Sequence, residues 1–463
     1  MKRLNWKIAL AVIVILALTF ALARIERGSE PAAGATNSTF NIESWKTANG
    51  ARVVFVPAPE LPMVDVQVVF DAGSARDGEL PGLAQITASM LDEGAGEWDT
   101  DQLAERFDNI GASYGVSVKR DMAAFSLRSL TEQDLLDQAL QTFATILGEP
   151  NFPTDAFNRV RRNTLVALQN KKQSPGDLAE DHFYRELFGK HPYATPVSGE
   201  EESIKAMAIA DLESFYQRYL VANNAVVAIV GQLDRQQAEE LAEQVTAKLN
   251  PGEVAPALPE VEALSEAKQV DQKHPSAQTH ILVGQPGMRR GDRDYFSLYV
   301  GNHILGGSGF GSRIMETIRE ERGLAYSSYS YFVPQRVKGA FIMGLQTSND
   351  QAQQALDLLH EVLAEFIDKG PTEDELQHAR KNITGGFPLR VDSNKDIVQY
   401  IAMIEFYDLP HDYLDTFNDK VEAVTTADIR DAFQRRINPE KLLTVTVGNG
   451  GACLLYTSPS PRD

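Results

Sequence analysis

The chain has 463 residues, of which 43% are hydrophobic and 23% are charged, a composition typical of soluble globular proteins. This length exceeds what one ordinary core organises, so about two or three domains are expected. The 64 Asp and Glu against 44 Lys and Arg give a formal net charge of −20. That balance argues against a nucleic-acid partner, because phosphate binding needs clustered cations. An acidic surface could attract basic peptides, although a well-solvated surface is the simpler interpretation.

The N-terminal residues 1–28 have the pattern of a targeting segment. Basic residues at positions 2, 3 and 7 precede an apolar run from Ile8 to Ala23, which ends in a small-x-small sequence. The run is shorter than the about 20 residues that cross a bilayer comfortably. A cleaved signal peptide and an uncleaved membrane anchor both stay open. Either one predicts an exported protein, periplasmic and soluble or anchored to the cytoplasmic membrane.

Hydrophobic spacing predicts the elements that follow a small, polar linker at 29–45. In chain order they are strands 51–56 and 64–70, helices 82–91 and 99–110, a hairpin of strands 114–118 and 123–130, helix 135–147, a helix capped by Thr154, and a buried strand 225–230. A Pro- and Glu-rich stretch, 251–268, is then predicted to link two domains.

The second half of the chain repeats the first in outline. FPTDAFNRVRRN (152–163) and GPTEDELQHARKN (370–382) each place Pro-Thr-acid at the start of a helix and a basic pair followed by Asn inside it. Two further pairs of predicted elements correspond: helix 135–147 with helix 356–366, and strand 225–230 with strand 443–447. The pattern predicts two tandem α+β domains, 46–250 and 269–448, and the alternative is chance similarity between amphipathic helices.

The single cysteine, Cys453, lies in an atypical tail, residues 449–463, which has no hydrophobic periodicity. One cysteine cannot form an intrachain disulfide, so stability must come from the core. We interpret the tail as a tag or as the product of a frameshift or an assembly error, and we expect it to be unstructured.

Three separated sequence segments resemble the signature motifs of one enzyme family. They are FDAGSARDGELPGLAQITASMLDEGA (70–95), HPYATPVSG (191–199) and SRIMETIREERGLAYSSYS (312–330). Their order and spacing are similar to those of the pitrilysin/insulinase zinc metallopeptidases, which include the mitochondrial processing peptidases. The resemblance runs from about residue 47 to residue 448. It implies two tandem homologous domains, each an antiparallel-rich sheet packed with helices on one side.

The zinc-binding motif of that family is missing from this chain. Active members carry His-x-x-Glu-His, in which two His one helical turn apart bind zinc and the Glu takes a proton from metal-bound water. Here Gln85, Ala88 and Ser89 stand at the three motif positions. The third ligand, a Glu on a later helix, aligns with Val166 or Ala167. The four changes together predict no catalytic residue and no metal site in this chain.

No other residues replace the lost site. The eight His are at 182, 191, 274, 280, 303, 360, 378 and 411, and no two of them are three or four residues apart. His191 belongs to a His-Pro-Tyr sequence that predicts a turn after a helix, so we expect it to have a structural role. The glycine cluster 306–311 lacks the Gly-Lys-Ser/Thr ending of a phosphate loop, so a helix end followed by a loop is expected. The non-catalytic subunit of the processing peptidases also uses a glycine-rich loop near substrate.

The residues that point to a retained substrate-binding role are Arg319 and Tyr326. In the family an Arg and a Tyr seven residues apart hydrogen-bond the substrate near the cleaved carbonyl, and this pair has that spacing. Arg319 is expected near the end of a helix, Gly323 is expected to stop that helix, and Tyr326 is expected to begin a strand. Without the resemblance, a surface ion pair with Glu320 or Glu321 and a packed Tyr would be the preferred interpretation.

The resemblance therefore implies a non-catalytic, substrate-binding subunit of a heterodimeric zinc metallopeptidase that acts on peptides outside the cytoplasm. The partner would be a homologous His-x-x-Glu-His chain that carries the zinc, while this chain binds no cofactor. The alternative is an inert scaffold subunit of a membrane-associated complex. A self-sufficient peptidase is disfavoured by the missing ligands.

Overall fold

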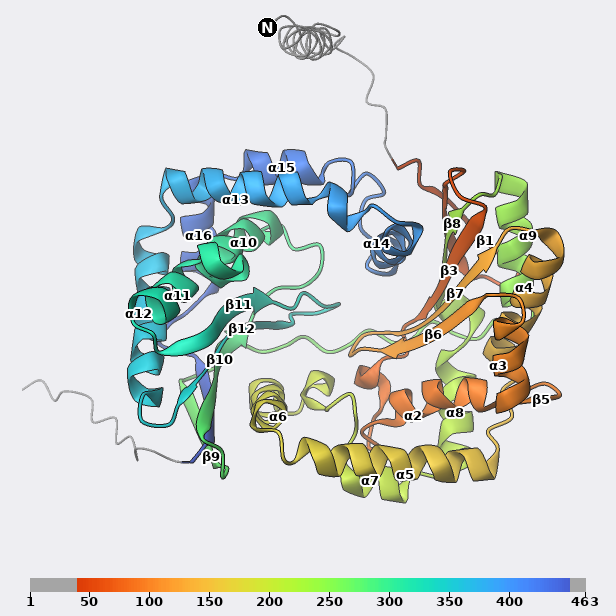
Figure 1. Ribbon diagram of the computed structural model, residues 1–463, viewed down its shortest axis with the longest axis horizontal. Coiled ribbons are helices and arrows are strands. Elements are labelled where there is room, and N and C mark those ends of the chain that lie inside the picture. Colours follow the sequence, from red (N-terminus) through yellow and green to blue (C-terminus); the bar gives the residue numbers. More distant parts are fainter. Residues whose placement is uncertain (1–39, 450–463) are drawn as a thin grey trace, which may run out of the picture. The chain divides into compact units, whose positions relative to one another are not determined.

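The computed structural model describes residues 40–449 (Figure 1). The predicted targeting segment, 1–28, and residues 450–463 of the predicted tail, with Cys453, lie outside the described residues. Within 40–449, none of the helices is both long and apolar enough to cross a bilayer.

The first half contains a six-stranded sheet in the order β1-β2-β8-β3-β7-β6. Its strands are β1 (Glu43–Lys46), β2 (Arg52–Pro57), β3 (Met63–Phe70), β6 (Ser113–Val118), β7 (Ala123–Leu130) and β8 (Ala225–Gly231), and a separate small ribbon is formed by β4 (Gly94–Ala95) and β5 (Trp98–Asp99). Strands β2 and β8 are parallel and the other neighbours are antiparallel. Strand β1 overlaps the end of the stretch predicted to be a linker, because Trp45 packs edge-on against Phe55 and holds this segment on the sheet.

The first half has eight helices among the described residues. They are α2 (Leu83–Met90), α3 (Thr100–Asp108), α4 (Gln133–Gly148), α5 (Thr154–Lys171), α6 (Pro175–Phe188), α7 (Glu201–Ala206), α8 (Ile209–Tyr219) and α9 (Arg235–Thr246). The four predicted ones, α2 to α5, agree with their predicted positions to within a few residues. The predicted cap at Thr154 is wrong. Thr154 is the first helical residue, and the cap position is Pro153, which has no side chain able to accept a hydrogen bond.

The second half contains a five-stranded sheet in the order β11-β12-β10-β13-β9. Its strands are β9 (Lys268–Lys273), β10 (Gln278–Pro286), β11 (Ala325–Phe332), β12 (Ala340–Ser348) and β13 (Leu443–Gly448). Its helices are α10 (Tyr295–Asn302), α11 (Arg313–Met315), α12 (Ala352–Lys369), α13 (Glu373–Gly386), α14 (Asn394–Phe406), α15 (Phe417–Ala423) and α16 (Thr426–Arg436).

The two sheets have the same topology, which confirms the predicted internal repeat. Read from one edge, β6-β7-β3-β8-β2 corresponds to β11-β12-β10-β13-β9. In each sheet the only parallel pair is the equivalent one, β2 with β8 and β9 with β13, among the strands that the structure describes. Both sheets are antiparallel-rich and carry helices on one face, as the α+β prediction requires.

The opposite face of each sheet is covered by a helix from the other half (Figure 1). Helix α14 packs on β8, β3 and β2 of the first sheet, where Ile401 lies in one core cluster with Val226 and Val230. Helix α6 packs on β13 and β10 of the second sheet, where Phe183 lies in one cluster with Val445. The halves therefore share cores, and residues 40–449 belong to one compact unit.

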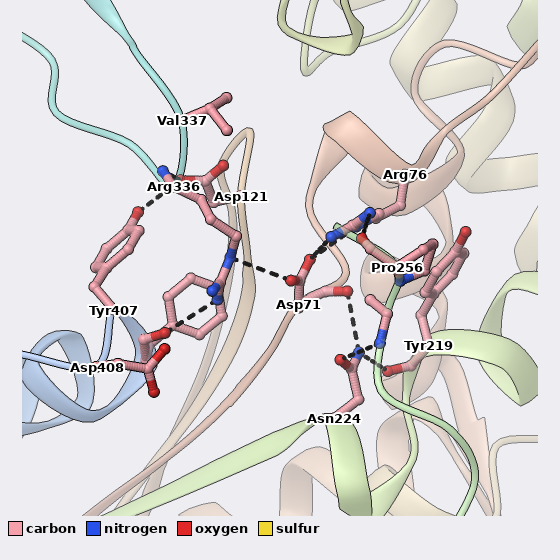
Figure 2. Close-up of polar contacts among 12 residues, drawn as sticks. Asp71, Arg76, Asp121, Tyr219, Asn224, Pro256, Arg336, Val337, Tyr407 and Asp408 are labelled. Atoms are coloured by element: carbon pink, nitrogen blue, oxygen red, sulfur yellow. Dashed lines mark hydrogen bonds and ion pairs between the residues drawn. The ribbon is translucent and has the colours of Figure 1, made fainter. Parts of the chain in front are cut away.

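A buried polar network joins the two halves beside these helices (Figure 2). Asp121, which is 3% exposed, accepts hydrogen bonds from the Tyr193 hydroxyl at 2.5 Å, the Tyr407 hydroxyl at 2.8 Å and the Arg336 backbone N–H at 2.8 Å. Tyr193 belongs to the first half and the other two donors belong to the second. Because each donor needs a partner when buried, this carboxylate fixes the junction.

A second carboxylate of this network is Asp71. It lies 2.7 Å from the Arg76 guanidinium of its own half and 3.3 Å from that of Arg336 in the second half. Arg76 also donates to the Pro256 carbonyl in the connecting stretch. Burial raises the pKa of Asp71, and the two guanidinium groups oppose that shift. The junction is thus held by paired charges as well as by shared cores.

Candidate functional site

Helix α2 carries the residues that replace the zinc ligands. Most of its residues are buried in the first core, and its two half-buried positions are Gln85 and Ser89, one helical turn apart. The Gln85 side-chain amide donates to the Ser89 hydroxyl at 3.1 Å, so these two groups satisfy each other. Ala88 is buried and offers no polar atom.

The position of the third family ligand lies on α5, which packs against α2. Val166 is 60% exposed there and cannot bind a cation. Among residues 40–449 no cluster of three or more His, Cys, Asp or Glu could hold a metal ion. The residues on this face are therefore neutral amides, hydroxyls and alkyl groups, which are poor zinc ligands.

His191 has the structural role predicted for it. Its Nδ1 accepts a hydrogen bond from the Tyr193 backbone N–H, and its Nε2 lies 3.0 Å from the Pro259 carbonyl. Burial lowers the pKa of His191, which favours the neutral ring that this bonding needs. The ring thus orders the turn that presents Tyr193 to Asp121.

The segment with Arg319 is a short helical stretch that ends where the sequence predicts. Arg319 lies in a π-helical turn, Glu316–Glu321, directly after α11. Gly323 has φ of +62°, and its N–H donates to the Arg319 carbonyl. This left-handed conformation is the usual glycine ending of a helix.

Tyr326 occupies a β-bulge at the start of β11. The pairing register with β12 shifts between Ala325 and Ser327, so Tyr326 is the extra residue of the strand. A bulge redirects the side chain of the inserted residue. Accordingly, Tyr326 is 81% exposed, whereas Ser328 two residues later is buried. The bulge is the feature that turns the phenol out of the sheet.

Arg319 and Tyr326 are in contact, and Phe310 joins them. The Arg319 guanidinium carbon lies 4.6 Å from the centre of the Tyr326 ring and 4.6 Å from that of Phe310. Phe310 is 66% exposed. Among the described residues Arg319 forms no ion pair, so the surface salt bridge considered from the sequence is absent. Stacking orients the guanidinium, and its N–H groups at the ring edges stay available for a ligand.

Phe310 was not predicted as a site residue. It stands in the glycine-rich loop 306–311, whose cluster was read as a helix end and loop. The loop approaches β11 closely, since a Cβ on Gly306 would lie 2.4 Å from the Ser330 nitrogen. Only glycine fits at that contact. The sequence feature that could have identified Phe310 as a site residue is its position as an aromatic residue within a run of glycines.

The equivalent place in the first half has a different pair of side chains. Gly111 has φ of +65° and precedes Tyr114 by three residues, as Gly323 precedes Tyr326. The residue corresponding to Arg319 is Phe107, whose ring is stacked on Tyr114 at 5.9 Å. The repeat thus conserves a stacked pair, and only the copy in the second half is charged.

Comparisons with known proteins identify the family. Residues 52–201 match the family described as "Insulinase (Peptidase family M16)", and residues 206–383 match "Peptidase M16 inactive domain". The crystal structure of a peptidase M16 inactive domain from Pseudomonas fluorescens is 38% identical to this chain. It superposes with a TM-score of 0.86, over 89% of this chain and 99% of that one. The chain belongs to the M16 peptidase family.

Further proteins are similar to this chain over most of its length. A Helicobacter pylori protein named "Non-peptidase homolog YmxG" is 27% identical over 84% of this chain and 90% of its own length. The Bacillus subtilis "Uncharacterized zinc protease YmxG" is 23% identical over 83% of this chain and 92% of its own. A protease structure from Helicobacter pylori shares the fold, with 18% identity and a TM-score of 0.81 over 88% and 99% of the two chains. With its ligand positions replaced, this chain is an inactive M16 homologue.

Proposed function

We propose that this chain is the non-catalytic, substrate-binding subunit of a heterodimeric zinc metallopeptidase that acts on peptides outside the cytoplasm. The observation that carries the proposal is the contact between the half-buried Arg319 and the exposed Tyr326, in a chain whose own metal positions are lost. The apolar run 8–23 supports export. A homologous His-x-x-Glu-His subunit would be the partner.

The chemistry of the pair suits the carbonyl of a peptide bond under attack. The guanidinium is always charged and offers several N–H donors, and the phenol adds an O–H donor. Donors of this kind stabilise the negative charge that develops on the carbonyl oxygen. Zinc held by the partner would supply the activated water. This chain would supply orientation and charge stabilisation.

Reconstitution tests the division of labour. The chain is purified alone and together with a homologous His-x-x-Glu-His chain of the same organism, and each sample is assayed for peptide hydrolysis and for zinc by atomic absorption. We expect no hydrolysis by this chain alone, and activity that rises to a plateau at equimolar subunits with one zinc per pair. Hydrolysis by the lone chain with stoichiometric zinc would refute the proposal.

Phe310→Ala should have a modest effect on the same reaction. The substitution removes one of the two rings that hold the Arg319 guanidinium, and an exposed cation–π contact contributes about 0.5–1 kcal/mol. We expect kcat/KM of the complex to fall about two- to fivefold. Phe310→Tyr, which keeps the ring, is the control and should retain activity.

A further inference from the structure

A cavity of about 810 Å³ lies between the first sheet and elements of the second half. Strands β3, β6 and β7 form one wall, and α14 with the turn at 333–335 forms the other. Its volume is within the range of about 300–1,000 Å³ typical of ligand sites. The amides of Gln67, Gln335 and Gln399 line it, and such groups can both donate to and accept from a peptide backbone.

The charge of this cavity is opposite to that of the whole chain. Seven of its lining residues are charged at neutral pH: the cations Lys119, Arg120, Arg128, Arg290 and Lys395, and the carboxylates Asp65 and Asp121. The excess is three positive charges, in a chain whose formal net charge is −20. A concave surface with an excess of one charge sign attracts ligands of the other sign.

Both carboxylates of the cavity already have partners. Asp65 is paired with Arg128 through two hydrogen bonds of 3.0 Å. Asp121 accepts the two tyrosine hydroxyls and the backbone N–H of the junction described above. Arg120 is also engaged, because it stacks on Tyr184 and donates to the Tyr193 carbonyl. These groups leave no acidic side chain of the lining available for the remaining cations.

Three cations of the lining have no carboxylate partner among the described residues, and one of them, Arg290, has its guanidinium carbon 5.9 Å from the centre of the Tyr295 ring and 5.7 Å from that of Tyr407. Lys119, Arg290 and Lys395 form no ion pair there, and the Nε of Arg290 is buried without a hydrogen-bond partner. They come from three separate elements: the β6–β7 turn, the stretch before α10, and α14. Cations spread over several walls suit carboxylates distributed along a chain better than one compact anion.

We propose that this cavity binds acidic side chains of an extended peptide, so that the substrates of the proposed heterodimer are acidic near one end. The inference rests on the proposed function and names the substrate class. Strand β11 carries Tyr326 at its start and leads to Val333 of the cavity wall after seven residues. At about 3.3 Å per extended residue, the acidic segment would lie about seven residues from the cleaved bond.

Binding to the full-length chain alone provides the test. The probes are fluorescein-labelled 12-residue peptides that carry four Glu, four Gln or four Lys at the same positions, measured by fluorescence anisotropy. We expect the Glu peptide to bind about tenfold or more tightly than its Gln counterpart and the Lys peptide to bind least. The preference should collapse at 1 M salt, where exposed charges are screened. Equal affinity for the Glu and Gln peptides would overturn the inference.

Matched variants locate the binding. Lys395→Glu on α14 should weaken the Glu peptide about fivefold or more. Lys381→Glu on α13, an exposed lysine that also forms no ion pair among the described residues, should change nothing, and thermal unfolding checks that both variants fold. An unchanged affinity in Lys395→Glu, or competition by inorganic phosphate alone at the affinity of the peptide, would contradict a peptide site here.

The two proposals fail in different experiments. Hydrolysis by the heterodimer that depends on Arg319, without any preference for acidic peptides, would remove the inference and leave the proposed function. Acidic-peptide binding that depends on Lys395, in a complex whose hydrolysis ignores Arg319, would leave the cavity as a binding site and remove the active-site role.

Discussion

Arg319→Ala should lower kcat of the reconstituted heterodimer about 10²–10³-fold. Removing one preorganised donor to a developing oxyanion has an effect of this size, and the guanidinium is held in place by contacts with two aromatic rings. The loss should appear mainly in kcat, because an interaction that strengthens only in the transition state contributes little to ground-state binding. Steady-state kinetics on a fluorogenic peptide, with gel filtration to confirm the complex, measure it.

Conservative and neighbouring substitutions separate this role from a structural one. Arg319→Lys keeps the charge but loses the planar fork of donors, so partial activity is expected. Tyr326→Phe removes only the hydroxyl and should cost about tenfold or more. Arg322→Ala, an exposed arginine three residues away, is the control and should have wild-type kinetics. If all these complexes hydrolyse peptide at the same rate, the chain is a scaffold, the alternative that the sequence left open.

Much of the fold was accessible from the sequence because it depends on local patterns. The alternation in β3 and the helical spacing in α4 each identify one element without knowledge of the others. The two similar sequence segments at 152–163 and 370–382 indicated the repeat, and they do begin equivalent helices, α5 and α13. The loss of zinc ligands was also local, since it follows from residue identity at Gln85 and Ser89.

Features that depend on contacts between distant residues were not accessible. The spacing of apolar residues in α6 and α14 shows that each helix has a buried face, but not that the buried face meets the sheet of the other half. The bulge at Tyr326 depends on the register with β12, which no residue of β11 encodes alone. Similarly, the meeting of Asp121 with Tyr407 joins residues 286 positions apart.

Asp121→Ala should destabilise the protein by about 3–5 kcal/mol, the largest effect that we expect from any single polar substitution. The change leaves the hydroxyls of Tyr193 and Tyr407 and the Arg336 N–H without their acceptor in a buried junction. Each stranded donor costs about 1–3 kcal/mol. Urea unfolding followed by circular dichroism and by tyrosine fluorescence measures the loss, and divergence of the two probes would indicate that the halves separate first.

Tyr407→Phe provides the matched comparison, because it removes one donor and leaves Asp121 with its other two. We expect a loss of only about 1 kcal/mol. Asp121→Asn should lie between the two variants, since its amide oxygen can accept but its NH₂ faces donors. Wild-type stability in Asp121→Ala would mean that the shared cores around α6 and α14 hold the halves unaided. A large loss would show that the carboxylate buried between the repeats is needed, beside the shared cores, to hold the two halves together.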